Sequence, residues 1–420
     1  MTMAYGHGAG PTRRSLAFGA GALYAWAHAP RFAQATTGRD PRLLVVILRG
    51  ALDGLSAVAP IGDPAYRGLR ESIALEAGGA NPALPLDGFF YLHPAMRETA
   101  RLFRERKLSV VHAVATPYRD RSHFDGQDVL ESGTPRPGAS RTGWLNRLAA
   151  HLPAGRALGR GEGQAGNPGA GGLAIGASTP LILRGPAPVL AWYPSDLPAA
   201  TATLFDRMEQ IYAHTDPKLA QALDRAIETD RMASEAGIGA NLNTRTQPHV
   251  QAARSIATGA ARFLVRPDGP RVAALSFDGF DTHAHTGGAS GRLADLLQAL
   301  DAALQAFEVE LAPVWRDTAI VVTTEFGRAA RLNGTLGTDH GNGTIALLAG
   351  GAIAGGRMIT DWPGLRENQL YERRDLMPTL DLRAVLKGVA MDLLGASDAA
   401  LSRDVFPGTE HLPPVRGLIV

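Results

Sequence analysis

Residues 43–48, Leu-Leu-Val-Val-Ile-Leu, form an unbroken aliphatic run with β-branched residues at its centre. A strand that alternates polar and apolar residues has one face in water, whereas a strand of this composition must be covered on both faces. Covering both faces requires helices on each side of a mostly parallel sheet. The run therefore favours a doubly wound α/β fold and predicts a strand inside its sheet.

Strand-like and helix-like segments alternate along the chain, as such a fold requires. Helical spacing over residues 94–107 precedes a strand candidate at 108–114. In the last third we predict strands at 272–277, 318–324 and 344–348, and helices at 292–309 and 380–394. The stretches 133–143 and 153–172 are rich in Gly, Pro and Arg and predict surface loops.

One large domain over residues 36–420 is expected, with a mainly helical cap inserted at about 173–260. Hydrophobic residues make up 45% of the chain and charged residues 20%, which is typical of a globular protein with a sizeable core. Cysteine is absent, which excludes disulfides, thiolate metal sites and cysteine nucleophiles. The formal charge of +2 is near neutral, so nothing in the charge indicates a nucleic-acid partner.

Residues 1–35 predict a twin-arginine signal peptide. Thr12-Arg13-Arg14-Ser15-Leu16 precedes a weakly apolar run at 17–29, and Ala33-Gln34-Ala35 has the small-x-small form of a cleavage site. The alternative is a buried or membrane-spanning helix, but the run is well short of the ~20 residues that cross a bilayer. We therefore expect cleavage after Ala35, export by the twin-arginine translocase to the periplasm or beyond, and no stable membrane span.

Five polar clusters follow predicted strands, and a doubly wound sheet gathers such loops at one rim. The first contains Asp53, which is either a metal ligand or a turn residue that caps the next helix. The second contains Ser122 between Arg119 and Arg121 at the expected start of a helix. Ser122 with Asp125 three residues later is also a capping-box pattern, and the same helix N-terminus suits a phosphate or sulfate group.

The third cluster contains Asp281, His283 and His285 in an extended loop. A carboxylate and an imidazole two residues apart can reach one cation, and His285 is available to that ion or to a neighbouring one. The alternative is a solvated turn rich in polar residues.

The fourth and fifth clusters contain Glu325 with Arg328, and Asp339 with His340. Glycines around Asp339 and His340 allow close approach to a metal ion, or alternatively serve only a tight turn. The five clusters together supply oxygen and nitrogen ligands suited to one or two ions of zinc, manganese, magnesium or calcium.

These residues resemble the bacterial family known as domain of unknown function 1501, within the alkaline-phosphatase-like superfamily, over residues 43–394. The most specific motifs are residues 48–55 (LRGALDGL), 121–124 (RSHF), 280–283 (FDTH), 324–328 (TEFGR) and 337–341 (GTDHG). The resemblance implies a metal-binding Asp53, a nucleophilic Ser122, and metal ligands at Asp281, His283, Glu325, Asp339 and His340. The superfamily often has Asp-His where this chain has Glu325-Phe326, so one nitrogen ligand is missing unless His123 or His285 supplies it.

Two functions follow from this resemblance. The first is a metal-dependent hydrolase of phosphate or sulfate esters, in which Ser122 attacks and Arg119, Arg121 or Arg328 holds the anion. Its substrate would be an anionic small molecule or a polysaccharide ester. The second is an exported binding or assembly protein that keeps the fold without turnover.

Overall fold

The computed structural model describes residues 39–152, 171–176, 178–193, 216–236 and 249–420, together with 208 and 212. The predicted signal peptide with its cleavage site after Ala35, the loop at 153–170 and parts of the predicted cap lie outside the described residues.

The described strands form a nine-stranded central sheet, in which β1 (Arg42–Leu48) occupies an inner position. The order is β11 (Met358–Ile359), β5 (Leu108–Ala115), β10 (Thr344–Ala349), β9 (Thr318–Thr323), β1, β8 (Val272–Phe277), β6 (Gly172–Ile175) and β7 (Val189–Trp192), and β12 (Leu380–Asp381) also pairs with β5. β1 runs parallel to β8 and β9, whereas β10 runs antiparallel to β5 and β9. The predicted mostly parallel α/β fold is confirmed.

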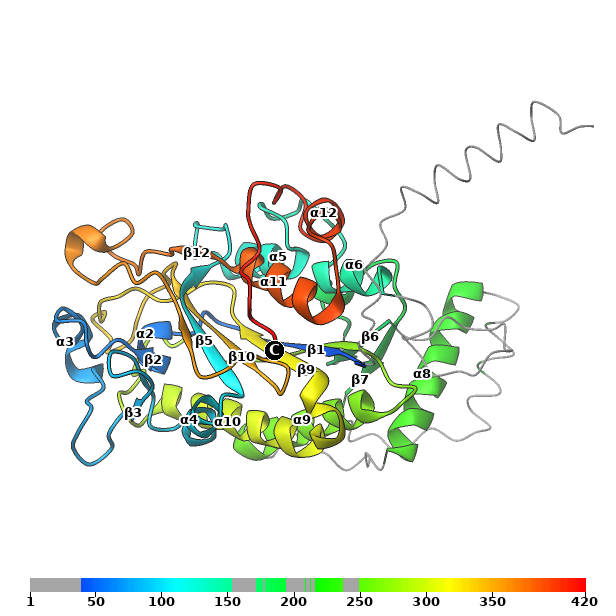
Figure 1. The fold of residues 1–420 in the computed structure, drawn as a ribbon, viewed down its shortest axis with the longest axis horizontal. Helices are drawn as coiled ribbons and strands as arrows, with labels where there is room; N and C mark the ends of the chain where they lie inside the picture. Colours follow the sequence, from blue (N-terminus) through cyan, green and yellow to red (C-terminus); the bar gives the residue numbers. More distant parts are fainter. Residues whose placement is uncertain are drawn as a thin grey trace, which may run out of the picture.

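The side chains of β1 divide between two hydrophobic cores. Leu44, Val46 and Leu48 point to one face, and Leu43, Val45 and Ile47 to the other, as the two-residue period of a strand requires. The first face is covered by α4 (Arg97–Arg104), α9 (His249–Val265) and α10 (Arg292–Glu310). The second is covered by α5 (His123–Ser132), α6 (Trp144–Ala150) and α11 (Leu382–Leu394), above the sheet in Figure 1.

Helix α10 illustrates how the sequence positions these layers. Leu293, Leu297, Leu300 and Leu304 recur at helical spacing and are all buried. Burying such a side chain contributes about 1.5–3 kcal/mol each. The apolar face therefore fixes α10 against the sheet and against α9, its most extensive helical neighbour among the described elements.

Within the segment predicted as a cap, two described strands pair with the central sheet and one described helix packs on α10. β6 pairs in parallel with β8, β7 extends the sheet beyond it, and α9 packs on α10. α8 (Pro217–Glu235) lies at this end of the molecule, next to β7 (Figure 1). Four-residue strands such as β6 and β7, flanked by prolines, carry too short a pattern to be distinguished from cap loops in the sequence.

Short elements complete the end of the sheet where the polar loops lie. α2 (Gly54–Ala57) and α3 (Tyr66–Arg70) follow β1, and β2 (Val58–Ala59), β4 (Tyr91–Leu92) and β3 (Leu84–Pro85) form a small second sheet. α12 (Asp398–Ala400) lies near the C-terminus. Within the described ranges, no helix is both long enough and apolar enough to span a bilayer.

Candidate metal centre

Five loops meet at the edge of the sheet where β1, β5, β8 and β9 end and antiparallel β10 begins. Gly50, which follows β1, shows why the approach is close. Its φ is 109°, and a Cβ atom there would lie 2.4 Å from the backbone nitrogen of Asp281. Only glycine combines this backbone conformation with this contact, so the first loop can pass directly beside the loop after β8.

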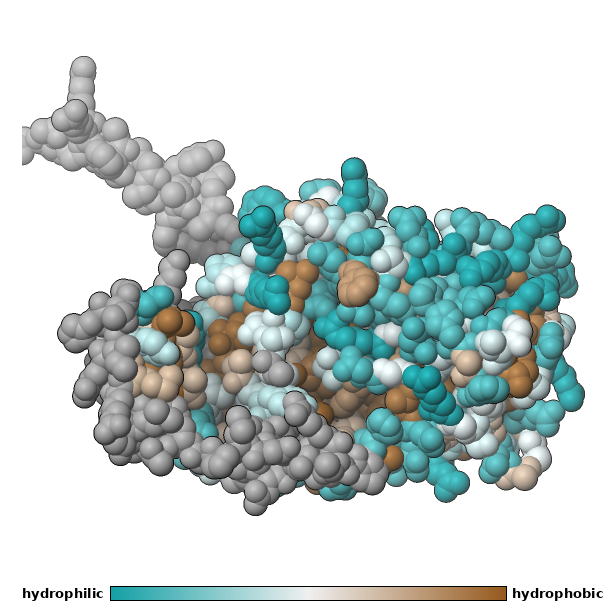
Figure 2. Space-filling view, turned by 180° about the vertical axis from the view of Figure 1, so that it is seen from behind, coloured by the Kyte–Doolittle hydropathy of each residue, from teal (hydrophilic) through white to brown (hydrophobic). Residues whose placement is uncertain are grey.

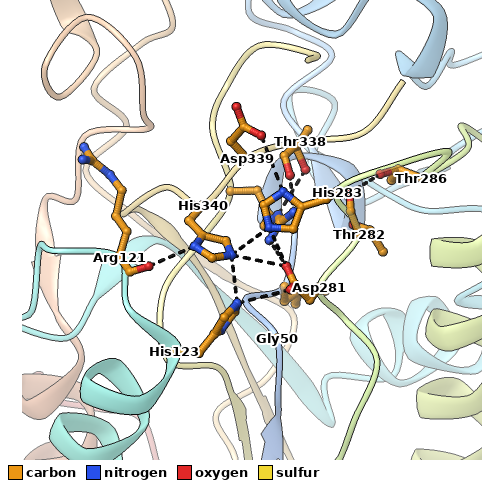
Figure 3. Close-up of polar contacts among 12 residues, drawn as sticks. Gly50, Arg121, His123, Asp281, Thr282, His283, Thr286, Thr338, Asp339 and His340 are labelled. Carbon is orange, nitrogen blue, oxygen red and sulfur yellow. Dashed lines mark hydrogen bonds and ion pairs between the residues drawn. The ribbon is translucent and has the colours of Figure 1, made fainter. Parts of the chain in front are cut away.

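Four side chains from three of these loops lie close together around Nε2 of His340 (Figure 3). The Nε2 atom of His340 lies 2.9 Å from Nε2 of His123 and 2.9 Å from Nε2 of His283. Asp281 Oδ1 lies 3.1 Å from Nε2 of His283 and 3.4 Å from Nε2 of His340, and its Oδ2 lies 3.5 Å from Nε2 of His123. Ligands held about 2.0–2.1 Å from one tetrahedral ion are separated by about 3.3 Å, close to these values.

The second nitrogen of each imidazole faces an oxygen acceptor. His123 Nδ1 lies 2.8 Å from Glu325 Oε1, and His340 Nδ1 lies 2.9 Å from the backbone oxygen of Arg121. His283 Nδ1 lies 3.5 Å from a carboxylate oxygen of Asp339. Because these oxygens only accept, the proton of each neutral imidazole belongs on Nδ1, and the lone pair of Nε2 faces the cluster. Lone pairs 2.9 Å apart repel unless a proton or a cation lies between them, so the donor set fits a bound metal ion.

Glu325 anchors His123 from inside the protein. It is fully buried and accepts hydrogen bonds from the backbone N–H of Gly50 at 2.9 Å and from Gln127 Nε2 at 3.2 Å. Burial alone would raise the pKa of Glu325, but the hydrogen bonds from His123 and from backbone N–H groups outweigh it and lower that pKa. The ionised Glu325 carboxylate in turn raises the pKa of His123 through their hydrogen bond.

Asp281 and His340 are held in the protonation states that a metal ion requires. Burial alone would raise the pKa of Asp281, but the hydrogen bond and charge of Arg328 lower it. Burial, together with the nearby His123 and Arg328, lowers the pKa of His340. At neutral pH these shifts favour an ionised carboxylate and a neutral imidazole.

The structure distributes the predicted metal ligands over three places. Asp281, His283 and His340 lie at the centre of the cluster, and Glu325 and Asp339 contact its histidines from outside. His285 is exposed and has no described side-chain contact with the cluster.

The carboxylate of Asp53 contacts residues of α2 and α3. It is buried, caps α2 by accepting from Ser56 N at 3.2 Å, and forms an ion pair with fully buried Arg70. In the structure Asp53 is thus a cap and a partner of Arg70.

The three arginines predicted to hold an anion all have partners within the protein. Arg328 is buried and donates to Asp281 at 2.6 Å and to Thr338. Arg121 donates from Nε to buried Asp375 at 2.9 Å, and its backbone has a φ of 62°. Arg119 donates to the backbone oxygen of Tyr118 at 2.8 Å. Arg121 therefore contributes to the centre chiefly through its carbonyl, which orients His340.

Ser122 occupies the N-cap position of α5, but its hydroxyl makes no cap hydrogen bond. The capping-box interpretation is wrong for this helix, since Asp125 instead lies 3.4 Å from the hydroxyl of Tyr118. The half-buried Ser122 hydroxyl is adjacent in sequence to the cluster residue His123.

His123 is the residue that the sequence identified only as a substitute ligand. The sequence position of His123 could have identified it as a ligand. A residue directly after a helix N-cap lies in the first turn of the helix, which in this fold is next to the strand ends. The three atoms that His123, Asp281 and His340 offer to an ion all lie within 4.8 Å of one another.

Residues 109–402 match the family described as protein of unknown function (DUF1501). The chain belongs to this family. The matched region contains all four residues of the cluster, and no curated protein matches the chain.

Solved structures with a similar chain path are distant in sequence. The PsFucS1 sulfatase from Pseudoalteromonas sp. is 12% identical with a TM-score of 0.39, covering 96% of this chain and 75% of that one. Ps i-CgsB in complex with k-i-k-neocarrahexaose is 10% identical with a TM-score of 0.39, covering 90% and 75%. The C-terminal periplasmic domain of EcEptC from Escherichia coli, in complex with Zn, is 11% identical with a TM-score of 0.33, covering 76% of both chains. At these scores the similarities assign no activity to this chain.

Proposed function

We propose that this protein is an exported, metal-dependent hydrolase of phosphate or sulfate esters, in which His123, Asp281 and His340 hold one divalent cation and His283 lies beside it. The observation that carries the proposal is the convergence of the Nε2 atoms of His123 and His340 with the carboxylate of Asp281, each imidazole having an oxygen acceptor at its other nitrogen. Two imidazole nitrogens and one carboxylate oxygen suit zinc best among the cations considered. A bound ion would supply positive charge that polarises the ester.

The chain's own nucleophile in this proposal is Ser122. Its hydroxyl makes no cap bond, and the first turn of α5 presents backbone N–H groups that suit an anionic ester oxygen. The bond from Ser122 Oγ to phosphorus or sulfur would form as the bond to the alcohol oxygen breaks, and the proton that leaves the serine hydroxyl would end on the departing alcohol oxygen. Water would then cleave the serine ester and release phosphate or sulfate.

Solvent exposure of Asp281 and His283 would allow such a substrate to reach the centre. The side chains of His283 and Asp281 are 44% and 42% exposed, whereas Glu325 behind His123 is fully buried. The centre therefore has a solvent side and a protein side.

A non-catalytic binding protein is the second candidate function, and a specific observation favours it. Structural zinc sites are typically closed by four protein ligands, and His283 lies beside the three converging residues, 2.9 Å from His340, as a candidate fourth. In addition, three arginines bond to groups within the protein: Arg119, Arg121 and Arg328. The charged group of an ester would then be bound mainly by the N-terminus of α5.

The test compares wild-type protein with Ser122→Ala, using elemental analysis and turnover of 4-nitrophenyl phosphate and 4-nitrophenyl sulfate. The hydrolase requires near-stoichiometric metal in both proteins and turnover in the wild type alone. The melting temperature should be retained, because the replaced hydroxyl caps nothing. Metal-loaded wild type that hydrolyses neither ester would favour the binding protein, and wild type that neither contains nor takes up metal would remove the hydrolase.

A further inference from the structure

A cavity of about 850 Å³ lies beside the metal centre, at the ends of β1, β6 and β8. Its volume is within the range of sites that bind small organic molecules. Figure 2 shows that hydrophobic residues gather in a hollow on the face drawn there, next to more hydrophilic surface.

Residues that line the cavity are sequence neighbours of residues in the metal centre, or contact them. Phe124 in the cavity wall follows His123, and Phe280 in the wall precedes Asp281. Gln127, also in the wall, donates its hydrogen bond to the Glu325 carboxylate that holds His123. A molecule in this cavity therefore lies next to the first turn of α5, where the ester group would bind.

The inner wall of the cavity is apolar. Ile175 and Leu275 come from the sheet, and Ile256 and Leu296 from α9 and α10. Phe124 forms part of the rim with 89% of its surface exposed, the largest exposure among the described large hydrophobic residues. An aromatic ring left in water beside a cavity gains apolar contact when another ring packs on it.

One edge of the cavity is polar. Arg49 donates to Gln127 at 2.6 Å and to Glu131 at 2.7 Å, which forms a chain of hydrogen-bonding groups along α5. Asp278 is exposed on the wall formed by the loop after β8. An occupant with a flat apolar face and hydroxyl groups along one edge matches these surroundings.

We infer that this cavity binds the organic part of the ester, a ring-bearing alcohol or phenol, while the charged group lies at the metal centre. The inference rests on the proposed hydrolase. Aromatic phenols and sugar rings share the required chemistry, an apolar ring face with an oxygen-bearing edge. The cavity therefore makes the protein selective for esters of bulky cyclic alcohols over esters of small ones.

The experiment introduces Ala252→Trp, which places a large side chain on the cavity wall from a half-buried position of α9. The matched control is Gln251→Trp, the exposed neighbour outside the cavity. The substrates are 4-nitrophenyl phosphate, glucose 6-phosphate and ethyl phosphate. We expect Ala252→Trp to raise KM for the ring esters about tenfold or more, to leave ethyl phosphate unaffected and to retain the metal, whereas Gln251→Trp behaves as wild type.

A lower KM for 4-nitrophenyl phosphate than for glucose 6-phosphate would assign a phenol, and the reverse a sugar. Equal kcat/KM for ethyl phosphate and both ring esters, unchanged by Ala252→Trp, would overturn the inference and leave the hydrolase intact.

Calorimetric binding of 4-nitrophenyl sulfate tests the case in which the cavity binds a ligand but the protein is not a hydrolase. Binding that Ala252→Trp weakens about tenfold and Gln251→Trp does not, with no turnover of any ester, would reject the hydrolase and keep the cavity as a ligand site. No binding and no turnover by the wild type would overturn both.

Discussion

The histidines of the metal centre are equivalent in the arrangement of their two ring nitrogens. In each, Nδ1 faces an oxygen of the protein and Nε2 faces the other ligands. A carbonyl oxygen cannot donate, so His340 in particular must carry its proton on Nδ1 when neutral. The tautomer that leaves Nε2 free for a cation is therefore set by the surrounding protein before any ion binds.

Replacing His123 should remove bound metal, whereas replacing His285 should not. We expect His123→Ala to reduce near-stoichiometric metal to a small fraction, and to abolish the stability difference between metal-loaded and chelator-treated protein. That difference amounts to about 4 kcal/mol when free metal is a thousandfold above Kd. Elemental analysis and urea unfolding measure both. Equal metal loss in His123→Ala and His285→Ala would contradict the assigned cluster.

Glu325 should tune metal affinity through His123 without binding the ion itself. Glu325→Gln keeps an oxygen acceptor for Nδ1 of His123 but removes the negative charge. Changes of this kind in the outer partner of a ligand histidine lower metal affinity by about 10–100-fold. Competition with a fluorescent zinc chelator measures the affinity, and an unchanged value would show that the Glu325 charge plays no part.

At the scale of elements, the turn after β1 is held by a buried ion pair. Asp53, the N-cap residue of α2, pairs with Arg70, the last residue of α3. Arg70 also donates to the backbone oxygens of Ala329 and Ala330 at 3.3 Å. This pairing ties the first loop of the site to the segment that follows β9. Removing one partner of such a pair is costly because the other remains buried and charged.

Asp53→Ala should therefore destabilise the protein by about 3–5 kcal/mol and leave its metal content unchanged. The control is Arg67→Ala, since the Arg67–Glu76 pair is exposed and such pairs contribute about 0–1 kcal/mol. Urea unfolding with parallel elemental analysis tests both variants. Loss of metal without loss of stability would instead identify Asp53 as a ligand.

Strand β5 contains a buried histidine that makes stability depend on pH. His112 is fully buried, accepts from the backbone nitrogen of Ala113 at 2.8 Å and donates to the backbone oxygen of Val58 at 3.0 Å. Burial lowers the pKa of His112 to about 4. His112 binds a proton near pH 6.5 in the unfolded chain but only near pH 4 in the folded chain. Acidification through this range therefore favours the unfolded chain. The free energy of unfolding is unaffected by protonation of His112 above pH 6.5 and falls as the pH drops from 6.5 toward 4.

Between pH 7 and pH 5, His112 should account for about 2 kcal/mol of lost stability. His112→Gln removes the titrating group, so the variant should be less stable at pH 7 but should lose about that much less on acidification. Urea unfolding at the two pH values gives the difference. Parallel pH profiles for the two proteins would show that His112 does not titrate as expected.

At the scale of the whole molecule, the sheet brings together loops that lie far apart in the chain. Gly50, His123, Asp281, Glu325 and His340 follow or precede five different strands. Because the helices on both faces fix those strands, the centre needs no covalent link between its loops. Such a site can form before the proposed export, and the proposed twin-arginine route transports folded proteins.

If the predicted signal peptide is correct, replacing Arg13 and Arg14 together with Lys should stop export and leave folding unchanged, because the arginine pair would be what the translocase recognises. Cell fractionation with an antibody to the mature protein measures this. We expect the double variant in the cytoplasm with its metal bound, whereas Arg39→Lys, outside the predicted leader, should be exported normally. Export of the double variant would remove the proposed route.

The sequence by itself determined the elements whose hydrophobic pattern is unambiguous. The aliphatic run of β1 and the spacing of leucines in α10 were predicted with bounds within a residue or two, because burial on a strand or helix imposes a local period. The strand-end loops that hold Asp281, His283 and His340 followed from the same pattern.

Only the tertiary structure decided how those loops divide their roles. Asp53 and Glu325 are both acids after buried strands, yet one pairs with Arg70 and the other with His123. His123 and Ser122 are adjacent, and the packing of α5 against the sheet places the imidazole in the cluster. Pairings between residues tens to hundreds of positions apart depend on how helices and strands pack in three dimensions, and no local period in the sequence encodes them.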